Sequence, residues 1–246
     1  MQNELKSKET AHAIAVKEMF SGIAGRYDLL NHVLSLNIDK RWRRKVREEI
    51  QSILDNKNAV VLDVACGTGD LSIELNRDSA ARVIGIDFCR PMLMVAHEKN
   101  AGNNADIPYV EGDAMNLSFA DSSFDALTIA FGLRNLANFS SGLKELHRVL
   151  KPGGRIAILE FSSPILPGFK QLFNFYFANV LPRIGGMVSG SRGAYEYLPD
   201  SVAKFPDQKA LVAMMEQTGF EDVKYQNLTG GIAAIHVGNK NAEACA

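Results

Sequence analysis

The 246-residue sequence has few cysteines, and they show no pairing pattern. Cys66, Cys89 and Cys245 lie far apart, and no Cys-x-x-Cys pair occurs. An odd number at such spacings argues against both a disulfide framework and a zinc site. We therefore expect no metal centre, and we expect reduced thiols in a cytoplasmic protein.

Long apolar runs and an excess of charge of one sign are also missing. No stretch reaches the roughly 18 apolar residues that a membrane span requires, and the polar first ten residues lack a signal-peptide core. Lysine and arginine total 27 against 28 for aspartate and glutamate, a net charge of −1. Such a balance argues against a nucleic-acid partner. The hydrophobic share of 46% and charged share of 22% exclude a disordered chain.

The hydrophobic pattern changes near residue 55. Residues 11–24 and 39–54 show helical spacing, whereas short β-branched runs alternate with helical segments after them. The expected strands are 59–65, 82–87, 107–111, 124–131 and 155–161. The expected helices between them are 70–77, 91–100 and 139–150, the last ended by Lys151-Pro-Gly-Gly154. Such alternation predicts a parallel sheet covered on both faces.

Beyond residue 161 the alternation pauses. Residues 162–205 form an insertion rich in Phe, Pro and Gly, after which Pro206 is expected to open a helix. Two strands, 220–228 and 231–237, then follow with a hairpin-like connection between them. We predict a single domain made of a helical cap (1–55), a cofactor-binding core (56–161), a substrate-lid insertion (162–205) and a C-terminal helix with strands (206–240).

The most informative motif runs from Val60 to Leu71, where a hydrophobic strand enters a turn with Gly67 and Gly69. Such glycines let the backbone approach a ligand closely. Asp63, on the strand, would repel a pyrophosphate but not a cation, and Ser72 replaces the third glycine of the dinucleotide fingerprint. The motif therefore favours S-adenosylmethionine, which carries a sulfonium and an ammonium, over a dinucleotide.

Two further acids follow the next two expected strands. Asp87 stands twenty positions after Gly67, where a carboxylate can accept from both ribose hydroxyls. Asp113 follows the third strand and could accept from an adenine amino group. The alternative is that Asp87 caps a helix and Asp113 serves a turn. Three ordered acids at three successive strand ends favour a ligand site.

These acids, followed by Arg148-Val-Leu-Lys-Pro-Gly-Gly154, resemble the pattern of class I S-adenosylmethionine-dependent methyltransferases. The resemblance implies a Rossmann-like α/β fold with a seven-stranded, mostly parallel sheet, an antiparallel last strand and an N-terminal helical cap. It also implies that S-adenosylmethionine is held by a set of residues along these motifs: Asp63, Gly67, Thr68, Gly69, Asp87, Asp113 and Ala114.

Other stretches resemble the ubiquinone/menaquinone biosynthesis C-methyltransferase family. They are 25–42, 131–135, 148–162 and 195–206, and together the likeness spans nearly the whole chain. Two positions depart from the family pattern. Asp39 stands four residues after Ser35, where the family has a histidine, and Ala130 replaces a serine. A histidine base at position 39 is therefore in doubt, and a hydroxyl contact at position 130 cannot exist.

The resemblance implies C-methylation of a demethylated polyprenyl quinol, with demethylmenaquinol as the first expectation. A ubiquinone precursor, another small phenol or acid, and a catalytically silent scaffold in quinone biosynthesis remain alternatives. The sequence does not select the ring, the length of the prenyl tail or the oligomeric state.

Four residues of the family motifs are candidates for the chemistry. Arg134 would stabilise a phenolate, and Tyr27, Tyr195 and Tyr197 would bind quinol oxygens or pack beside the ring. The alternatives are that Arg134 pairs with a cap-helix carboxylate such as Asp28 and that Tyr27 is a cap or core residue. No general base can be named.

A lipophilic substrate also suggests contact with a membrane surface. Residues 161–195 contain no acid, three cations and five phenylalanines. This composition suits a lid or a contact with anionic lipid, although an ordinary buried helix is equally compatible. The basic run 40–47 would add to such a contact. We therefore expect a cytoplasmic protein that can be peripheral at the inner face of the membrane.

Overall fold

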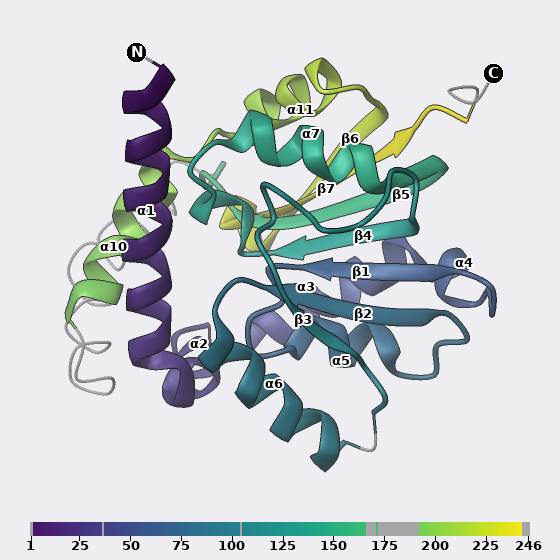
Figure 1. Ribbon diagram of the computed structural model, residues 1–246, viewed down its shortest axis with the longest axis horizontal. Helices are drawn as coiled ribbons and strands as arrows, with labels where there is room; N and C mark the ends of the chain where they lie inside the picture. The colour runs from purple at the N-terminus through teal and green to yellow at the C-terminus, as the bar shows by residue number, and fades with distance from the viewer. Residues whose placement is uncertain (1, 36, 104, 166–170, 172–191, 243–246) are drawn as a thin grey trace.

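A seven-stranded sheet runs through the centre of the computed structural model, which describes residues 2–35, 37–103, 105–165, 171 and 192–242 (Figure 1). The strand order is β3-β2-β1-β4-β5-β7-β6. The strands are β1 (Val60–Val64), β2 (Arg82–Asp87), β3 (Tyr109–Glu111), β4 (Phe124–Ala130), β5 (Leu150–Phe161), β6 (Phe220–Leu228) and β7 (Ala233–Lys240).

Strand direction agrees with the expectation from the sequence. β1 pairs in parallel with β2 and β4, and β3 and β5 extend the parallel part on either side. The last strand, β7, is antiparallel to both of its neighbours, β5 and β6. The predicted mostly parallel sheet with an antiparallel last strand is confirmed.

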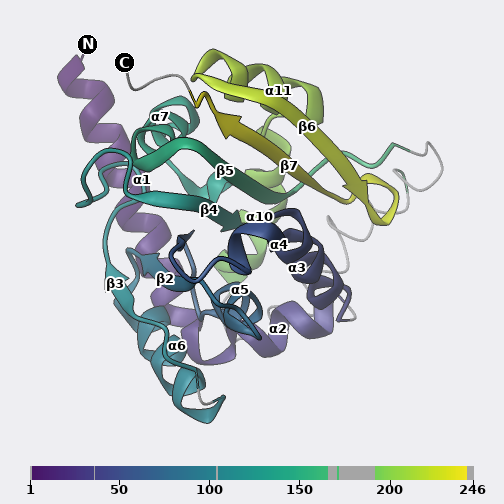
Figure 2. The same cartoon turned by 90° about the vertical axis from the view of Figure 1, so that its right-hand side faces the viewer.

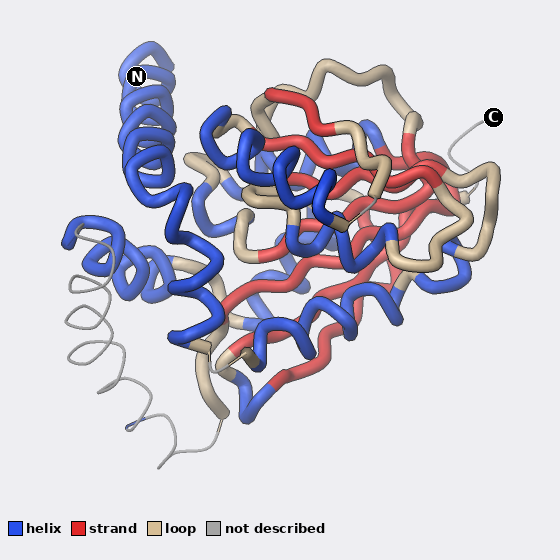
Figure 3. The backbone as a smooth tube through the Cα atoms, turned by 90° about the horizontal axis from the view of Figure 1, so that it is seen from below, coloured by secondary structure: helices blue, strands red, loops and turns tan. Residues whose placement is uncertain are grey.

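Helices cover both faces of this sheet (Figure 3). Those before the insertion are α1 (Gln2–Ile23), α2 (Tyr27–Leu34), α3 (Ile38–Glu49), α4 (Gln51–Leu54), α5 (Asp70–Asn76), α6 (Arg90–Gly102) and α7 (Phe139–Val149). α10 (Arg192–Lys204) lies within the insertion and α11 (Gln208–Gln217) follows it, along the β6–β7 hairpin (Figure 2). Short 3₁₀ helices occupy Ala24–Arg26, Leu133–Asn135 and Thr229–Gly231.

Alternation along the strands separates two hydrophobic cores. On β5, Ile156 and Ile158 join the core formed with α7 and α11, whereas Ala157 and Leu159 join the one formed with α3 and α5. Successive side chains of a strand point to opposite faces, so a strand buried on both faces reads as a continuous apolar run. This is why the central strands could be predicted from short β-branched segments.

Several expected boundaries were wrong. The long helix 39–54 is divided at Ile50, whose φ of −119° and ψ of 15° lie outside the helical region. The helix expected over 139–150 does end at Val149, but the strand expected from 155 already begins at Leu150 and includes Lys151-Pro-Gly-Gly154; β3 begins at Tyr109 rather than at 107. The helix expected at Pro206 begins at Gln208, because the Asp207 side chain accepts from the Ala210 amide and caps it.

The first helix stands across the end of the sheet. In Figure 1, α1 and α10 lie beside the carboxyl ends of β1 and β4, and α1 also contacts α6. Most of the expected lid, residues 166–170 and 172–191, lies outside the described residues. Within the described ranges, no helix has the length and apolar character needed to cross a bilayer.

Candidate functional site

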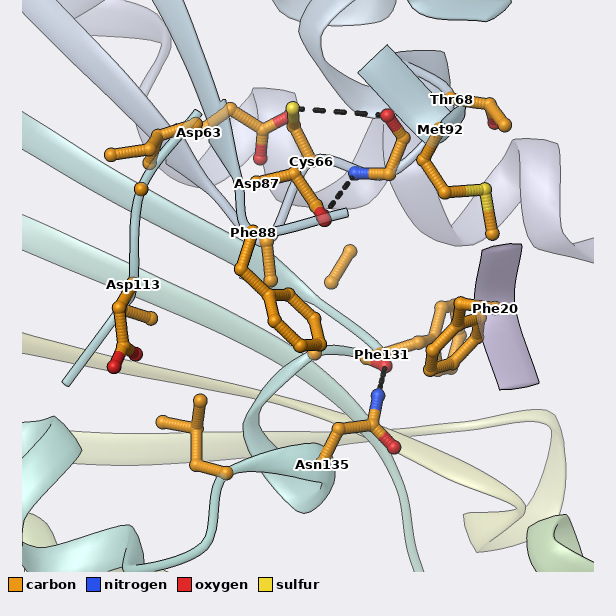
Figure 4. Close-up of a pocket in the computed structure, with 18 of the residues that line it drawn as sticks. Phe20, Asp63, Cys66, Thr68, Asp87, Phe88, Met92, Asp113, Phe131 and Asn135 are labelled. Atoms are coloured by element: carbon orange, nitrogen blue, oxygen red, sulfur yellow. Dashed lines mark hydrogen bonds between the residues drawn. The ribbon is translucent and has the colours of Figure 1, made fainter. Parts of the chain in front are cut away.

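A cavity of about 370 Å³ opens at the carboxyl ends of β1, β2 and β4 (Figure 4). The chain leaves β1 towards β2 on one side, and β4 lies on the other, so this is the switch point at which open α/β sheets bind ligands. Residues from α1, α2 and α3 close the cavity from outside. The fold therefore places the glycine turn, the strand-end acids and the N-terminal cap around one space.

The glycine turn has the backbone conformation that its sequence suggests. Gly67 and Gly69 have φ values of 56° and 81°, in the left-handed region where side chains are strained. A Cβ at Gly67 would meet nothing within 4 Å, whereas one at Gly69 would strike the Tyr109 hydroxyl. Gly67 is therefore open to a ligand, and Gly69 is required by the packing beneath the turn.

Asp87 both supports the turn and lines the cavity. Its Oδ2 accepts from the Gly67 amide at 2.8 Å, and its Oδ1 accepts from the Cys89 amide at 2.8 Å. Burial raises the pKa of this carboxyl to about 6, although the two amides oppose the rise. A carboxylate has about four acceptor sites, so these two hydrogen bonds leave Asp87 able to accept from a ligand. The N-cap of α6 is Cys89, without a side-chain capping bond, so the helix-cap alternative for Asp87 is not what the structure shows.

Asp63 is buried in the same wall, with only 1% of its surface exposed. Its carboxylate accepts from the Ser72 hydroxyl at 2.6 Å and the Thr128 hydroxyl at 2.9 Å. Burial raises its pKa to about 6, and the nearby Asp87 adds to the rise. Ser72, which stands where a dinucleotide site has glycine, is therefore the donor that keeps Asp63 in place.

The other predicted ligand contacts have local partners as well. Thr68 lines the cavity, but its hydroxyl donates to Asp28 of α2. Asp113 and Ala114 also line the cavity, and the Asp113 Oδ1 accepts from the Met115 amide, as the turn alternative expected. The structure brings all seven predicted cofactor residues to one end of the sheet. Their direct contacts with a ligand stay predictions.

An ion-pair network ties the cap helices to the glycine turn. Arg43 of α3 bridges Asp39 and Asp70, with its Nη2 3.0 Å from Asp70. Lys99 of α6 bridges Asp70 and Asp28. Although burial favours the protonated acid, Arg43 and Lys99 hold the pKa of Asp70 below its usual value. Asp70 directly follows Gly69, so the network fixes the start of α5 against α2 and α3.

His32, Asp39 and Asp70 bring three ligand-type atoms within 4.8 Å of one another. Arg43 and Lys99 already neutralise the two carboxylates. The His32 Nδ1 lies 2.9 Å from the Asp39 Oδ2. We therefore describe the group as part of the ion-pair network rather than as a cation site.

Arg134 pairs with an acid that the sequence did not suggest. Its Nη1 lies 2.9 Å from the Glu160 Oε1, and both side chains are at least 95% buried. The expected alternative partner, Asp28, instead binds Lys99 and Thr68. The alternative reading of Arg134 as a partner of Asp28 is therefore wrong.

The side chains of two of the three candidate tyrosines, Tyr27 and Tyr197, are described in the structure. Tyr27 lines the cavity, and the Tyr197 hydroxyl donates to the Asn135 Oδ1 at 3.1 Å. Burial raises the pKa of both phenols, and Arg134 is the first of the charges that oppose the rise. Tyr195 belongs to α10, but its side chain lies outside the description. Tyr197 and Arg134 are not among the described residues that line the cavity, but both adjoin Asn135, which is.

Several lining residues were missed by sequence reasoning. They are Glu9, Thr10, Ala13 and Phe20 of α1, Arg43, Phe88, Met92, Phe131 and Asn135. Figure 4 shows the rings of Phe20, Phe88 and Phe131 around the same space as the carboxylates. Phe88 directly follows Asp87 and could have been found from that position. The α1 residues carry no local signal, because only tertiary packing brings that helix over the site.

The sequence matches one protein family over nearly its whole length and is similar to named methyltransferases. The model of the ubiE/COQ5 methyltransferase family matches residues 4–240. The chain is 50% identical over 227 residues to a demethylmenaquinone methyltransferase from Deinococcus radiodurans, covering 92% of each chain. It is 48% identical over 229 residues to the ubiquinone/menaquinone biosynthesis C-methyltransferase UbiE from Geobacter sp., covering 92% of this chain and 96% of the relative.

A solved S-adenosylmethionine-dependent methyltransferase from Thermotoga maritima shares the fold. Its TM-score is 0.64 at 16% identity, and the match covers 91% of this chain and 99% of the other. At this identity the likeness concerns the fold alone.

We expect Asp63→Asn to alter the pH dependence of stability. The folded-state pKa of Asp63 is about 6, above the roughly 3.9 of an unfolded aspartate. The folded protein therefore keeps this proton where the unfolded chain loses it. The resulting stabilisation is present below about pH 4 and is lost as the pH rises through about 6. The variant lacks this titration, so its stability relative to wild type should improve by about 1 kcal/mol between about pH 5.0 and 7.5.

Urea unfolding of the ligand-free protein at the two pH values measures this difference. Asp106→Asn changes an exposed aspartate on the loop before β3 and is the matched control, for which no such change is expected. A stability difference between Asp63→Asn and wild type that is the same at both pH values would contradict the assignment.

Proposed function

The chain belongs to the ubiE/COQ5 methyltransferase family, and from this premise we propose that it transfers a methyl group from S-adenosylmethionine to a ring carbon of demethylmenaquinol. The observation that carries the proposal is the pair of buried carboxylates, Asp63 and Asp87, in the cavity wall. Neither forms an ion pair with a lysine or arginine among the described residues. Buried charges without a counter-ion are costly, and a cationic ligand would offset that cost.

The residues of the cavity fit S-adenosylmethionine. Asp87 would accept from ribose hydroxyls, and the open face of Gly67 leaves room for the backbone to approach the ligand. Asp63 and Asp87 give this end of the cavity the sign that a sulfonium and an ammonium require. When bound, S-adenosylmethionine supplies an electrophilic methyl group on a positively charged sulfur.

The remaining wall suits a flat aromatic substrate. Phe131 packs between Trp42 and Phe161, with ring centroids 6.0 and 4.6 Å away, and Phe20 meets Tyr27 edge-to-face at 5.9 Å. These rings keep water out, which strengthens the electrostatic interactions inside the cavity. They also limit the orientations of a bound ring, and such positioning contributes strongly to a transfer between two bound reactants.

Arg134 is the cation available to the substrate end. A hydroquinone that loses a phenol proton pushes electron density into its ring, so that an adjacent carbon can attack the methyl group. The bond between sulfur and the methyl carbon would break to release S-adenosylhomocysteine, and the methylated ring carbon would lose its hydrogen as a proton to water, which restores the aromatic ring. Arg134 would stabilise the phenolate, with Tyr27 and Tyr197 contributing hydroxyls beside it. We assign no side chain as general base, and solvent water accepts the phenol proton in this proposal.

Demethylmenaquinol ranks before the other substrates because the relative that is 50% identical over 92% of its length is a demethylmenaquinone methyltransferase. A second relative is described as serving both ubiquinone and menaquinone synthesis, so a ubiquinone precursor is the alternative. Gly67, Gly69, Asp87 and Arg134 are all present at the site, which argues against a silent scaffold.

We also propose that the protein works from the cytoplasm in contact with an anionic membrane surface. Lys40, Arg41 and Arg44 are exposed on α3 and form no ion pair with a described residue. Ile165, 59% exposed, lies against Gly230, and Trp42 of α3 binds the neighbouring Thr229. A basic helix face beside an exposed apolar side chain suits anionic lipid.

The substrate assignment is tested with labelled S-adenosylmethionine and short-chain forms of demethylmenaquinol and of the demethylated ubiquinol precursor. We expect label on a ring carbon of the naphthoquinol, identified by mass analysis. Preferred labelling of the benzoquinol would select the ubiquinone alternative. Absence of transfer to both quinols, in a protein that binds the cofactor, would support the scaffold alternative.

Asp87→Asn should weaken S-adenosylmethionine binding by about 10- to 100-fold, because a hydrogen bond to a charged group is worth roughly 1.5 to 3 kcal/mol. The asparagine keeps one acceptor for the Gly67 or Cys89 amide, which favours retention of the turn. Calorimetric titration measures the affinity, with Asp106→Asn as a surface control. Equal affinities in Asp87→Asn and wild type would remove Asp87 from the binding site.

Co-sedimentation with vesicles measures the membrane contact. We expect retention on phosphatidylglycerol vesicles but not on phosphatidylcholine, and we expect the double variant Arg41→Ser/Arg44→Ser to lose it. Lys144→Ser/Lys209→Ser removes the same charge from exposed positions on α7 and α11 and should bind as wild type. Equal loss in the two double variants would show that net charge, and not the α3 face, governs retention.

A further inference from the structure

The pair of Arg134 and Glu160 is a buried ion pair at the end of the sheet. The exposed fractions of the two side chains are 5% and 1%, and the Nη1–Oε1 distance is 2.9 Å. Burying two charges is costly unless their remaining hydrogen-bonding sites are satisfied. An apolar pair would fill such a position at lower cost, so the pair calls for a reason beyond stability.

Glu160 binds Arg134 at two points. Its Oε1 accepts from the Arg134 Nη1, and its Oε2 accepts from the Arg134 backbone amide at 3.2 Å. The Phe161 amide donates to Oε1 at 2.9 Å and fixes the carboxylate in turn. The last residues of β5 therefore hold both the backbone and the guanidinium of the short helix that follows β4.

The guanidinium is also fixed from its other sides. Nη1 donates to the Phe131 carbonyl, and the guanidinium carbon lies 5.3 Å from the centroid of the Phe161 ring. Phe131 itself has a φ of 56°, a left-handed conformation that is costly for a bulky residue. Such strain persists only where the surroundings impose it, and the Arg134 and Asn135 side chains both bind the Phe131 carbonyl.

The Nε donor of Arg134 is buried without a partner among the described residues. Arg134 itself is not among the described residues that line the cavity. Buried donors are almost always satisfied, so an exception calls for an explanation. Burial raises the pKa of the Tyr27 and Tyr197 phenols, and the positive charge of Arg134 lowers it. Arg43 also lowers the pKa of Tyr27 and Asp28 raises it, whereas Glu160 and Asp200 raise the pKa of Tyr197. Tyr27 lines the cavity together with Asn135, the partner of Tyr197.

We propose that Glu160 is a positioning residue for methyl transfer: it holds the Arg134 guanidinium against Phe131, which lines the cavity, so that the arginine charge acts on the phenol oxygen of a substrate bound there. The proposal rests on the proposed function, because it needs a phenolic substrate. Glu160 does not touch the substrate and acts through Arg134. It also balances the arginine charge when the cavity holds no phenolate.

The test is a double-mutant cycle on the full-length protein. Glu160→Gln removes the charge with little change of shape, and Arg134→Met removes the guanidinium. We expect kcat for the quinol that the wild type methylates to fall by about 10- to 100-fold in Glu160→Gln, because small misplacements of a positioned group cost this much. KM should change less than kcat, since the interaction strengthens as the phenolate forms. Calorimetric affinity for S-adenosylmethionine should stay within about twofold of wild type, which separates loss of positioning from loss of the site.

Non-additivity distinguishes positioning from a structural role. If Glu160 acts through Arg134, the double variant Arg134→Met/Glu160→Gln should have the kcat of Arg134→Met alone. Glu160→Asp keeps the charge but is one methylene shorter, so its kcat should lie between those of Glu160→Gln and wild type. The control is Glu145→Gln, which breaks the Glu145–Arg148 pair at the end of α7 and should keep wild-type kcat.

The experiment distinguishes failure of this inference from failure of the proposed function. An active wild type with unchanged kcat in folded Glu160→Gln, or losses that add in the double variant, would overturn the inference alone. A wild type that methylates neither quinol would overturn the proposed function and the inference with it. Circular dichroism and thermal unfolding establish folding. If Glu160→Gln does not fold, the comparison of Glu160→Asp with wild type and of the double variant with Arg134→Met decides the question.

Discussion

Asp63 and Asp87 are carboxylates that the fold buries at the ends of neighbouring strands without giving them a lysine or arginine partner among the described residues. Their hydrogen bonds come from two hydroxyls and two backbone amides, which orient the oxygens but add no positive charge. Both pKa values therefore stand near 6. The Gly67 amide of the turn and the Cys89 amide before α6 donate to Asp87, and Ser72 of α5 donates to Asp63. The geometry of the site therefore depends on these two carboxylates.

The N-terminal cap is attached to the same turn by charges that are fully paired. Asp70 and Asp28 share Lys99, and Arg43 joins Asp70 to Asp39. Burial raises the pKa of Asp39 and Asp70 as well, but Arg43 and the other partners of these two acids lower it by more, so that both pKa values lie below the usual value. The acids of the motif thus divide into those that hold the structure together and those left for a ligand.

Much of the fold could be predicted because its signals are local. The strand, glycine turn and helix of residues 60–76 follow one another in the sequence, and the carboxyl ends of parallel strands must meet at one edge. The contribution of α1 could not be predicted, since Phe20 reaches the cavity only through tertiary packing. The break at Ile50 and the start of β5 at Leu150 were also missed, because local helix and turn preferences do not encode the sheet.

The residues of the candidate site likewise divide into those that the local sequence predicts and those that only the fold brings together. Asp87 was recognisable from its spacing after Gly67, whereas Glu160 looked like an ordinary motif residue until β5 brought it to Arg134. The charged groups also differ along the cavity: carboxylates without an ion-pair partner among the described residues line it at the glycine turn, and the Arg134 guanidinium, paired with Glu160, adjoins Phe131 on the other side. A reaction in which a cation gives a methyl group to an anion has this same polarity. Under the proposed function, Glu160 would balance the Arg134 charge until the phenolate forms, so that the guanidinium keeps its position through the transfer.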